Sequence, residues 1–108
     1  MKTYKVTVDD LGTIRWYNEK GKLHREDGPA IEWADGSKEW FLKGRIHRED
    51  GPAIEWANGY KAWYLNDKML TEQEWKAQTQ KHTIVIDGKS IQLSNESYKV
   101  LQKSLLTN

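Results

Sequence analysis

One polar motif occurs twice in this chain of 108 residues, and it carries the side chains that acid–base or metal chemistry would need. It reads His-Arg-Glu-Asp at residues 24–27 and again at 47–50, each time directly before Gly-Pro. Histidine next to a carboxylate can serve as a general base, and histidine with aspartate can ligate a metal. A catalytic or metal-binding role for His24 or His47 is therefore the first hypothesis.

A structural role for the two motifs is the stronger hypothesis. Asp27 and Asp50 can hydrogen-bond to the backbone of their own turns, and Arg25 and Arg48 can pair with carboxylates of neighbouring units. A repeat duplicates its scaffold more readily than it duplicates an active site. The sequence thus predicts that the protein is not an enzyme, with no catalytic residues, no metal ligands and no cofactor.

A third hypothesis gives the same motifs a role in binding. Identical loops stacked along a sheet form a charged stripe that a partner can recognise. We therefore assign four residues of the motifs as candidate partner-binding residues: Arg25, Glu26, Arg48 and Glu49.

The motifs belong to a tandem repeat. Residues 23–45 align without gaps on residues 46–68, and 15 of the 23 positions are identical. A partial copy occupies residues 1–22, where residues 11–17 echo the second half of the unit. The first domain is predicted to be an array of these units over residues 1–70.

Each unit is expected to form a β-hairpin. Asp-Gly at residues 35–36 and Asn-Gly at residues 58–59 separate runs of alternating character, and such dipeptides suit a two-residue type I′ turn. A single hairpin is marginal in water, so the units are expected to stack side by side in a sheet.

A two-residue turn would also fix which side chains share a face. Trp33 would lie opposite Lys38, and Ile31 opposite Trp40. The face predicted to be buried carries Trp33, Trp40, Trp56 and Trp63. The other face leaves aromatic rings beside basic side chains, as in protein hot spots and base-stacking surfaces. We assign to it the candidate partner-binding residues Tyr17, Phe41, Tyr60 and Tyr64.

The remainder of the chain, residues 71–108, is predicted to be an α-β-β-α cap. Residues 71–74 match a capping box, and Trp75 offers an apolar anchor for the first helix. Asp-Gly at residues 87–88 separates two short strands, and Ser94 begins a final helix. The predicted fold is mainly β (α+β overall): consecutive antiparallel β-hairpin repeats forming an elongated curved sheet, with a C-terminal helix-hairpin-helix cap.

Composition narrows the classes of function. Seventeen basic against sixteen acidic residues give a net charge of +1, which argues against a strongly basic nucleic-acid footprint. The chain has no cysteine, which excludes disulfides and thiolate chemistry and favours a reducing cytosol. No apolar stretch has the length of a membrane span. We expect a cytoplasmic protein with no membrane partner.

The repeat resembles a known family. Its pattern is Gly-Pro-Ala-x-x-Trp, a turn with Asp-Gly or Asn-Gly, and then x-Lys-x-Trp followed by Tyr or Phe and Leu, over about residues 11–68. This is similar to the MORN repeat variant, and the HREDGPA form is most similar to repeats of phage, giant-virus and antitoxin-like bacterial proteins. The resemblance implies consecutive hairpins that serve as a binding scaffold.

These observations predict a small non-catalytic protein-binding module. The resemblance implies a phage or antitoxin-like inhibitor that neutralises a bacterial defence or toxin protein by steric occlusion. If the chain is phage-encoded, we expect it in the host cytoplasm. The alternative is a nucleotide-sequestering or nucleic-acid-binding protein, with Arg25, Arg48 or Lys61 on phosphate and aromatic rings on bases. Near-neutral charge makes that alternative weaker. Because open sheet edges invite pairing, a homodimer is a further expectation.

Overall fold

The computed structural model of the chain describes residues 3–106, except for the side chains of residues 81–84, 86, 94–96, 98 and 104–106. It divides into two compact units, one ending at Glu72 and one beginning at Gln73. Each unit is described by itself below.

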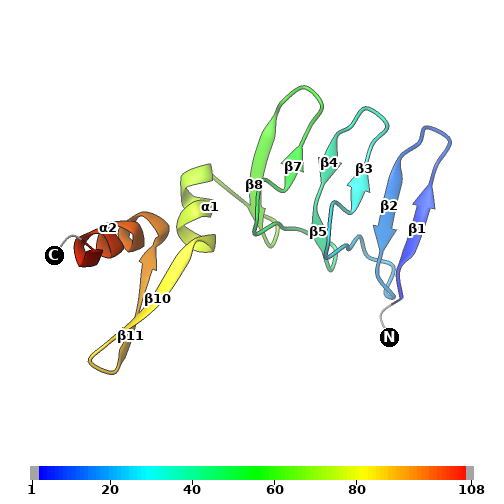
Figure 1. Cartoon of the computed structure of the whole chain (residues 1–108). Coiled ribbons are helices and arrows are strands. Elements are labelled where there is room, and N and C mark those ends of the chain that lie inside the picture. The colour runs from blue at the N-terminus through cyan, green and yellow to red at the C-terminus, as the bar shows by residue number, and fades with distance from the viewer. Residues whose placement is uncertain (1–2, 107–108) are drawn as a thin grey trace. The chain divides into compact units, whose positions relative to one another are not determined.

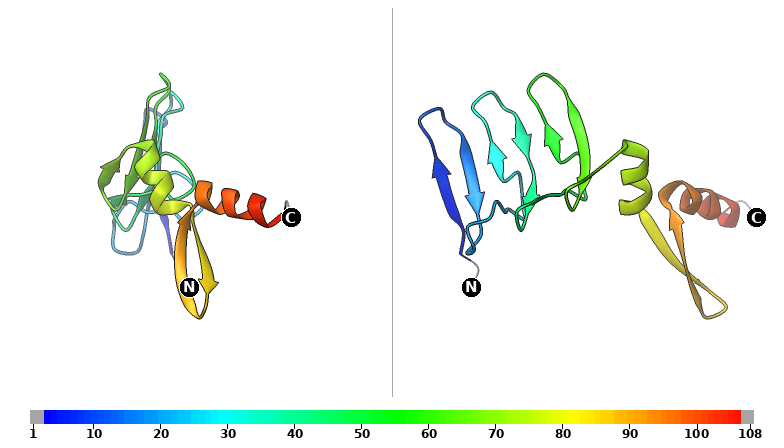
Figure 2. Two further views of the ribbon diagram at one scale, coloured as in Figure 1. Left: turned by 90° about the vertical axis from the view of Figure 1, so that its left-hand side faces the viewer. Right: turned by 180° about the vertical axis from the view of Figure 1, so that it is seen from behind.

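The first unit is an antiparallel sheet of hairpins. The hairpins β1–β2, β3–β4 and β7–β8 stand side by side with their turns at the same end (Figure 1 and the right-hand view of Figure 2). The sheet has seven strands in this order: β1 (Lys5–Val8), β2 (Ile14–Tyr17), β3 (Ile31–Glu32), β4 (Lys38–Glu39), β7 (Ile54–Glu55), β8 (Lys61–Leu65) and β9 (Lys68–Leu70). A short pair, β5 (Phe41–Leu42) and β6 (Arg45–Ile46), follows the second hairpin. The predicted mainly β fold of antiparallel hairpins is confirmed.

The turns at the tips of the second and third hairpins differ from the prediction. Each is a three-residue loop. In the second hairpin, Trp33 N–H donates to the Ser37 carbonyl at 2.9 Å and Gly36 N–H to the Trp33 carbonyl at 3.0 Å, and the third hairpin has the equivalent hydrogen bonds. Gly36 has a φ of 93°, as expected for a type I turn closed by a glycine bulge. The Asp35 carboxylate accepts a hydrogen bond from Ser37 N–H, which favours this loop over a type I′ turn.

The extra loop residue shifts the predicted register by one. Glu32 pairs with Lys38, and Ile31 with Glu39, so the predicted pairs of Trp33 with Lys38 and of Ile31 with Trp40 are wrong. A shift of one residue exchanges the faces of a strand. Trp33 and Trp40 therefore lie on opposite faces, and the predicted buried face of four tryptophans does not form.

The observed register aligns opposite charges across the sheet. One row of paired residues runs Glu32, Lys38, Glu55, Lys61, so acidic and basic side chains alternate along it. The row that faces the other way runs Arg15, Ile31, Glu39, Ile54, Ala62. Opposite charges on neighbouring strands stabilise a sheet, so the first row supports this register.

A second kind of turn closes each repeat at the base, the end opposite the tips. These base turns are Lys43-Gly44, between Leu42 and Arg45, and Asn66-Asp67, between Leu65 and Lys68. All of their residues have φ between 49° and 82°, as a two-residue type I′ turn requires. The sequence prediction placed this turn type at the tips and overlooked it at the base.

The core of the sheet is thin. Its buried apolar side chains are mostly small or branched: Ala30, Ile31, Ala53, Ile54, Ala62 and Leu70. Trp56 is 44% exposed, and Trp33, Trp40 and Trp63 are only partly buried. Hydrophobic burial alone is therefore modest here, and polar contacts between hairpins must carry much of the order.

The second unit has the predicted helix-hairpin-helix order. It contains α1 (Glu72–Thr79), β10 (Lys81–Ile86), β11 (Lys89–Ser94) and α2 (Asn95–Leu106), and α2 contacts both strands. Asp87 and Gly88 form a two-residue turn with φ of 52° and 77°. Trp75 on α1 is 4% exposed. No helix among the described residues has the length and apolar character needed to cross a membrane.

The tip turn makes a testable prediction about Gly36. Gly36→Ala should lower the free energy of unfolding by about 1–2 kcal/mol, because alanine pays that cost for a left-handed backbone. Gly36→Asn should lower it less, since asparagine adopts that conformation more readily. Urea unfolding of the two variants checks this. A loss no smaller for asparagine than for alanine would contradict the assigned turn.

Candidate functional site

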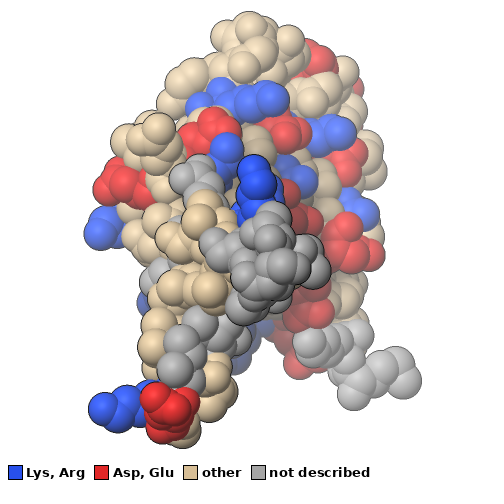
Figure 3. Space-filling view, turned by 60° about the vertical axis from the view of Figure 1, so that its left-hand side comes forward, with Lys and Arg blue, Asp and Glu red and all other residues tan. Residues whose placement is uncertain are grey.

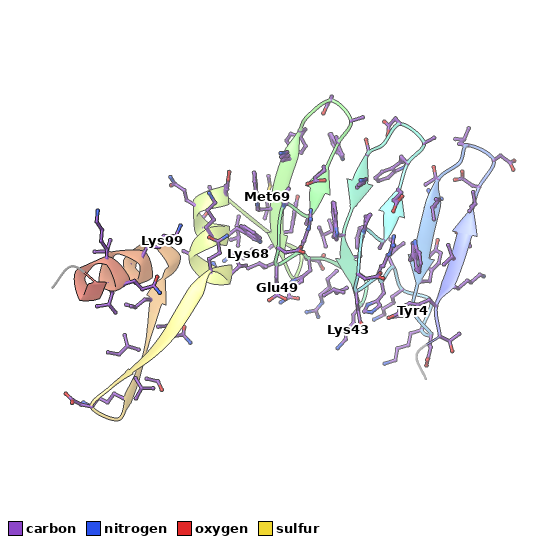
Figure 4. All side chains as sticks on the ribbon, viewed as in Figure 1. Tyr4, Lys43, Glu49, Lys68, Met69 and Lys99 are labelled. Atoms are coloured by element: carbon purple, nitrogen blue, oxygen red, sulfur yellow. The ribbon has the colours of Figure 1, made fainter. Side chains whose placement is uncertain are left out.

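The HRED loops, residues 24–27 and 47–50, lie at the base of the sheet, and Glu49 is labelled there in Figure 4. In the first loop, Arg25 Nε donates to Asp27 at 3.0 Å, and its Nη1 donates to the Pro29 carbonyl and to Glu32, both at 3.2 Å. The guanidinium is thus held by three acceptors of its own repeat.

The second loop reproduces these contacts. Arg48 Nε donates to Asp50 at 2.8 Å, and its Nη1 donates to the Pro52 carbonyl at 3.0 Å and to Glu55 at 3.3 Å. The sequence analysis expected carboxylates of neighbouring units as the partners of these arginines. That expectation is wrong, because the carboxylates come from the same repeat.

The neighbouring hairpin contributes an aromatic ring instead. The guanidinium carbon of Arg25 lies 4.1 Å from the ring centre of Trp16, and that of Arg48 lies 3.7 Å from the ring centre of Trp40. Such stacking stabilises a cation on an aromatic face. Each HRED loop therefore joins its own hairpin to the preceding one.

The glycine after each loop makes room for this arginine. A Cβ atom added at Gly28 would lie 2.8 Å from the guanidinium carbon of Arg25, and one added at Gly51 would lie equally close to that of Arg48. Any larger side chain would have to displace the guanidinium. The close approach of the guanidinium thus explains the glycine at this position of both repeats.

The histidines secure the base turns. His24 Nδ1 accepts a hydrogen bond from Lys43 N–H at 2.8 Å, and His47 Nδ1 accepts one from Asn66 N–H at 3.0 Å. His24 is 7% exposed, and its Nε2 lies 3.5 Å from Glu26. With Nδ1 already engaged by the backbone, His24 is poorly placed as a general base.

The polar residues of the loops divide into an inner and an outer set. The side chains of Arg25 and Arg48 are only 20% and 19% exposed. The outward groups are acidic, and we call them the acidic rim: Glu26, Asp27, Glu49 and Asp50, whose side chains are 50–85% exposed. A hollow of about 580 Å³ between the loops brings the predicted residues Arg25, Glu26, Arg48 and Glu49 together.

The predicted aromatic row is less coherent. Of Tyr17, Phe41, Tyr60 and Tyr64, only Tyr60 counts as exposed, at 44%, and no ring contact joins the four within the described residues. Tyr60 packs instead on Trp56, with ring centres 4.8 Å apart. Phe41 and Tyr64 accept backbone hydrogen bonds from Arg25 and Arg48, so they belong partly to the scaffold.

A second hollow lies between the tips of the second and third hairpins, and we call it the tip hollow. It measures about 460 Å³ and is lined by Trp33, Asp35, Ser37 and Glu39 from one hairpin and by residues 56–58 from the next. Ser37 Oγ accepts a hydrogen bond from Ala57 N–H at 2.9 Å and ties the two hairpins together.

Glu39 gives the tip hollow its charge. Burial raises the pKa of this carboxyl above its ordinary value, and a hydrogen bond from the Trp56 side chain partly offsets that shift. Among the described side chains, no lysine or arginine forms an ion pair with Glu39. Hydrogen bonds from the backbone N–H and then the hydroxyl of Ser37 lower the pKa of Asp35 below its ordinary value.

Sequence analysis did not find the tip hollow. Its two indoles are spaced by one repeat, at Trp33 and Trp56, but the assumed two-residue turn placed Glu39 on the opposite face from them. The signal was available, since a turn of Asp-Gly followed by serine also suits a three-residue loop.

On the face drawn in Figure 3, basic and acidic side chains are interspersed, in agreement with the net charge of +1. Local groups such as the acidic rim and the tip hollow are therefore the features by which a partner could be distinguished.

Comparison with known proteins leaves the resemblance as a prediction. No family model matches the chain, and neither the curated proteins nor the solved structures give a match. The function therefore has to be argued from the side chains themselves.

The role assigned to His24 can be tested by substitution. His24→Ala should lower the free energy of unfolding by about 1–3 kcal/mol, because Lys43 N–H loses its buried acceptor. His24→Asn places an amide oxygen near the Nδ1 position and should recover part of the loss. Chemical denaturation measures both. An asparagine variant as unstable as the alanine variant would show that the Nδ1 hydrogen bond is not what His24 provides.

The burial of Glu39 predicts a dependence of stability on pH. Because its pKa in the folded protein lies above the ordinary value of 4.5, the folded state binds this proton more tightly than the unfolded chain, and this group's contribution falls as pH rises through that range. Glu39→Gln should therefore raise the free energy of unfolding at about pH 7 and leave it nearly unchanged at about pH 3, where the carboxyl is protonated. Denaturation at the two pH values checks this. A glutamine variant less stable than the parent at the higher pH would contradict it.

Proposed function

We propose that this chain is a non-catalytic protein-binding module, an inhibitor of the phage or antitoxin-like kind that neutralises a bacterial protein by covering its surface. The bacterial defence or toxin target follows from the resemblance of the repeat. The proposal of a binding module also has support from the side-chain geometry, which is independent of that resemblance.

The observation that carries the proposal is the identical use of the HRED side chains in two repeats. Each arginine is stacked and hydrogen-bonded within the scaffold, and each histidine accepts a backbone hydrogen bond. Because the same contacts occur in both repeats, we assign these side chains a structural role. What remains for recognition is the acidic rim, the tip hollow and the exposed rings of Trp56 and Tyr60.

The acidic rim favours a partner with a basic surface. Asp27 and Asp50 are paired with Arg25 and Arg48, and the exposed carboxylates of Glu26 and Glu49 leave the outer edge of the loops acidic. Complementary charge speeds association and selects the partner. A nuclease, whose substrate-binding surface is basic, is the kind of target that such a rim could cover by steric occlusion.

One observation favours the alternative of a bound nucleotide. A hollow of about 370 Å³ at the base of the first two hairpins is lined by Tyr4 together with Lys20, Lys22 and Lys43. Tyr4 and Lys43 both lie at this end of the sheet in Figure 4. However, Glu19 and Glu26 also line it, and the Tyr4 ring is already stacked on His24 at 5.9 Å. Arg25 and Arg48, the phosphate ligands first considered, are engaged elsewhere.

Native mass spectrometry after an affinity pull-down from bacterial lysate separates these functions. The expected result is a stoichiometric complex with one protein, together with the mass of any self-association. A nucleotide mass with no protein partner would overturn the proposal and point to the hollow around Tyr4.

Charge variants then test the acidic rim on the captured partner. Glu26→Gln combined with Glu49→Gln should weaken binding by about three- to tenfold, mainly through a slower association rate, and should reduce its dependence on salt. The matched control is Asp10→Asn with Asp87→Asn, which removes the same charge at exposed turns outside the rim. Equal losses in the two double variants would assign the effect to net charge alone.

A further inference from the structure

We propose that the tip hollow binds one cationic side chain, lysine or arginine, presented by the partner protein. The inference rests on the proposed function in one respect, that the partner is a protein. It adds a specific anchor at the hairpin tips, distinct from the acidic rim at the base.

Two indoles form the apolar part of this site. Trp33 and Trp56 occupy the same position in successive repeats, beside the tip turns, and each follows a buried isoleucine by two residues. Trp56 packs on Tyr60 but is still 44% exposed, so part of its ring remains available to a ligand. The face of an indole carries negative potential and attracts ammonium and guanidinium groups.

A carboxylate supplies the charge. Glu39 on β4 pairs in register with Ile31 on β3 and with Ile54 on β7, so it stands between the two strands that lead to the indoles. It is partly buried and has a hydrogen bond from Trp56, and no described basic side chain pairs with it. Asp35 adds a second carboxylate at the edge of the hollow.

The first hairpin shows the same position with its charge already satisfied. Counting from the tip glycine, Arg15 corresponds to Glu39 and Asp9 corresponds to Trp33. Arg15 Nη1 lies 3.0 Å from Asp9 Oδ2, so that hairpin closes the position with an internal ion pair. At the second hairpin, Glu39 stands in place of the arginine and Trp33 in place of the aspartate. An external cation would restore the missing half of the pair.

Other ligands fit the hollow less well. A phosphate or nucleic acid would meet two carboxylates, Glu39 and Asp35, and be repelled. A neutral apolar group would contact the indoles but would bury the Glu39 charge further without a counter-charge, which is unfavourable. A lysine or arginine side chain satisfies both parts, because its apolar stem can lie on the rings while its head group pairs with the carboxylate.

A titration followed by nuclear magnetic resonance tests the site without the natural partner. The probe is N-acetyl-lysine methylamide, and the matched control is N-acetyl-norleucine methylamide, which has the same stem without the ammonium group. The indole N–H signals of Trp33 and Trp56 should shift saturably with the lysine probe. The protein should bind the norleucine probe at least about tenfold more weakly. Equal binding of the two probes would overturn the proposal.

Glu39→Gln provides the matched test on the protein. The substitution should weaken binding of the lysine probe by about tenfold or more. It should leave the protein at least as stable as the parent, because it removes a partly buried charge. A loss of binding then cannot be assigned to unfolding. Asp10→Asn removes one charge from an exposed tip residue of the first hairpin and should leave probe binding within about twofold of the parent. Unchanged probe binding by Glu39→Gln would overturn the assignment.

The outcomes separate this inference from the proposed function. If a protein partner is captured but the lysine probe shows no saturable shift, the cation site is wrong while the binding module stands. If the probe binds through Glu39 but the lysate yields only a nucleotide, the cation site is supported and the proposed function is wrong.

Discussion

The contact on which this structure most depends is the stacking of an arginine of one repeat on a tryptophan of the hairpin before it. Arg48 lies 3.7 Å from the centre of the Trp40 ring and is fixed there by Asp50, the Pro52 carbonyl and Glu55. The sheet buries mainly alanine and isoleucine, so it has little apolar area with which to hold neighbouring hairpins together. A guanidinium that stacks on a ring and is hydrogen-bonded along its edge provides a directional contact between neighbouring hairpins. The same contact occurs in both repeats.

Because the HRED contacts are repeated within the chain, they separate the positions that build the sheet from those that differ between hairpins. Since the HRED arginines and histidines are committed to the scaffold in both repeats, the loops offer carboxylates to the outside. The tips differ from one hairpin to the next, with Arg15 and Asp9 paired at the first and Glu39 beside two indoles at the second. The two full repeats thus share their scaffold contacts, while the tip positions differ from one hairpin to the next.

The sequence alone predicted the hairpin repeats and the helix-hairpin-helix order, because glycine turns and exact repetition are local signals. It did not predict the register. Asp35-Gly36 suits either a two- or a three-residue loop, and the choice depends on the Asp35 hydrogen bond to Ser37 N–H. The one additional loop residue decides whether Glu39 shares a face with Trp33. The tip hollow therefore could not be predicted from the sequence. The stacking of Arg25 on Trp16 also escaped, since it joins residues whose proximity follows only from the assembled sheet.

The most direct test of the central claim, that the HRED loops are structural links between hairpins, is a double-mutant cycle on the stability of the protein. The free energy of unfolding would be measured for Arg48→Leu, Trp40→Leu and the double variant by chemical denaturation. The account predicts that the two losses are not additive, with a coupling energy of at least about 1 kcal/mol between guanidinium and ring. Additive losses, or an Arg48 variant as stable as the parent, would contradict it and return the motif to consideration as a functional site.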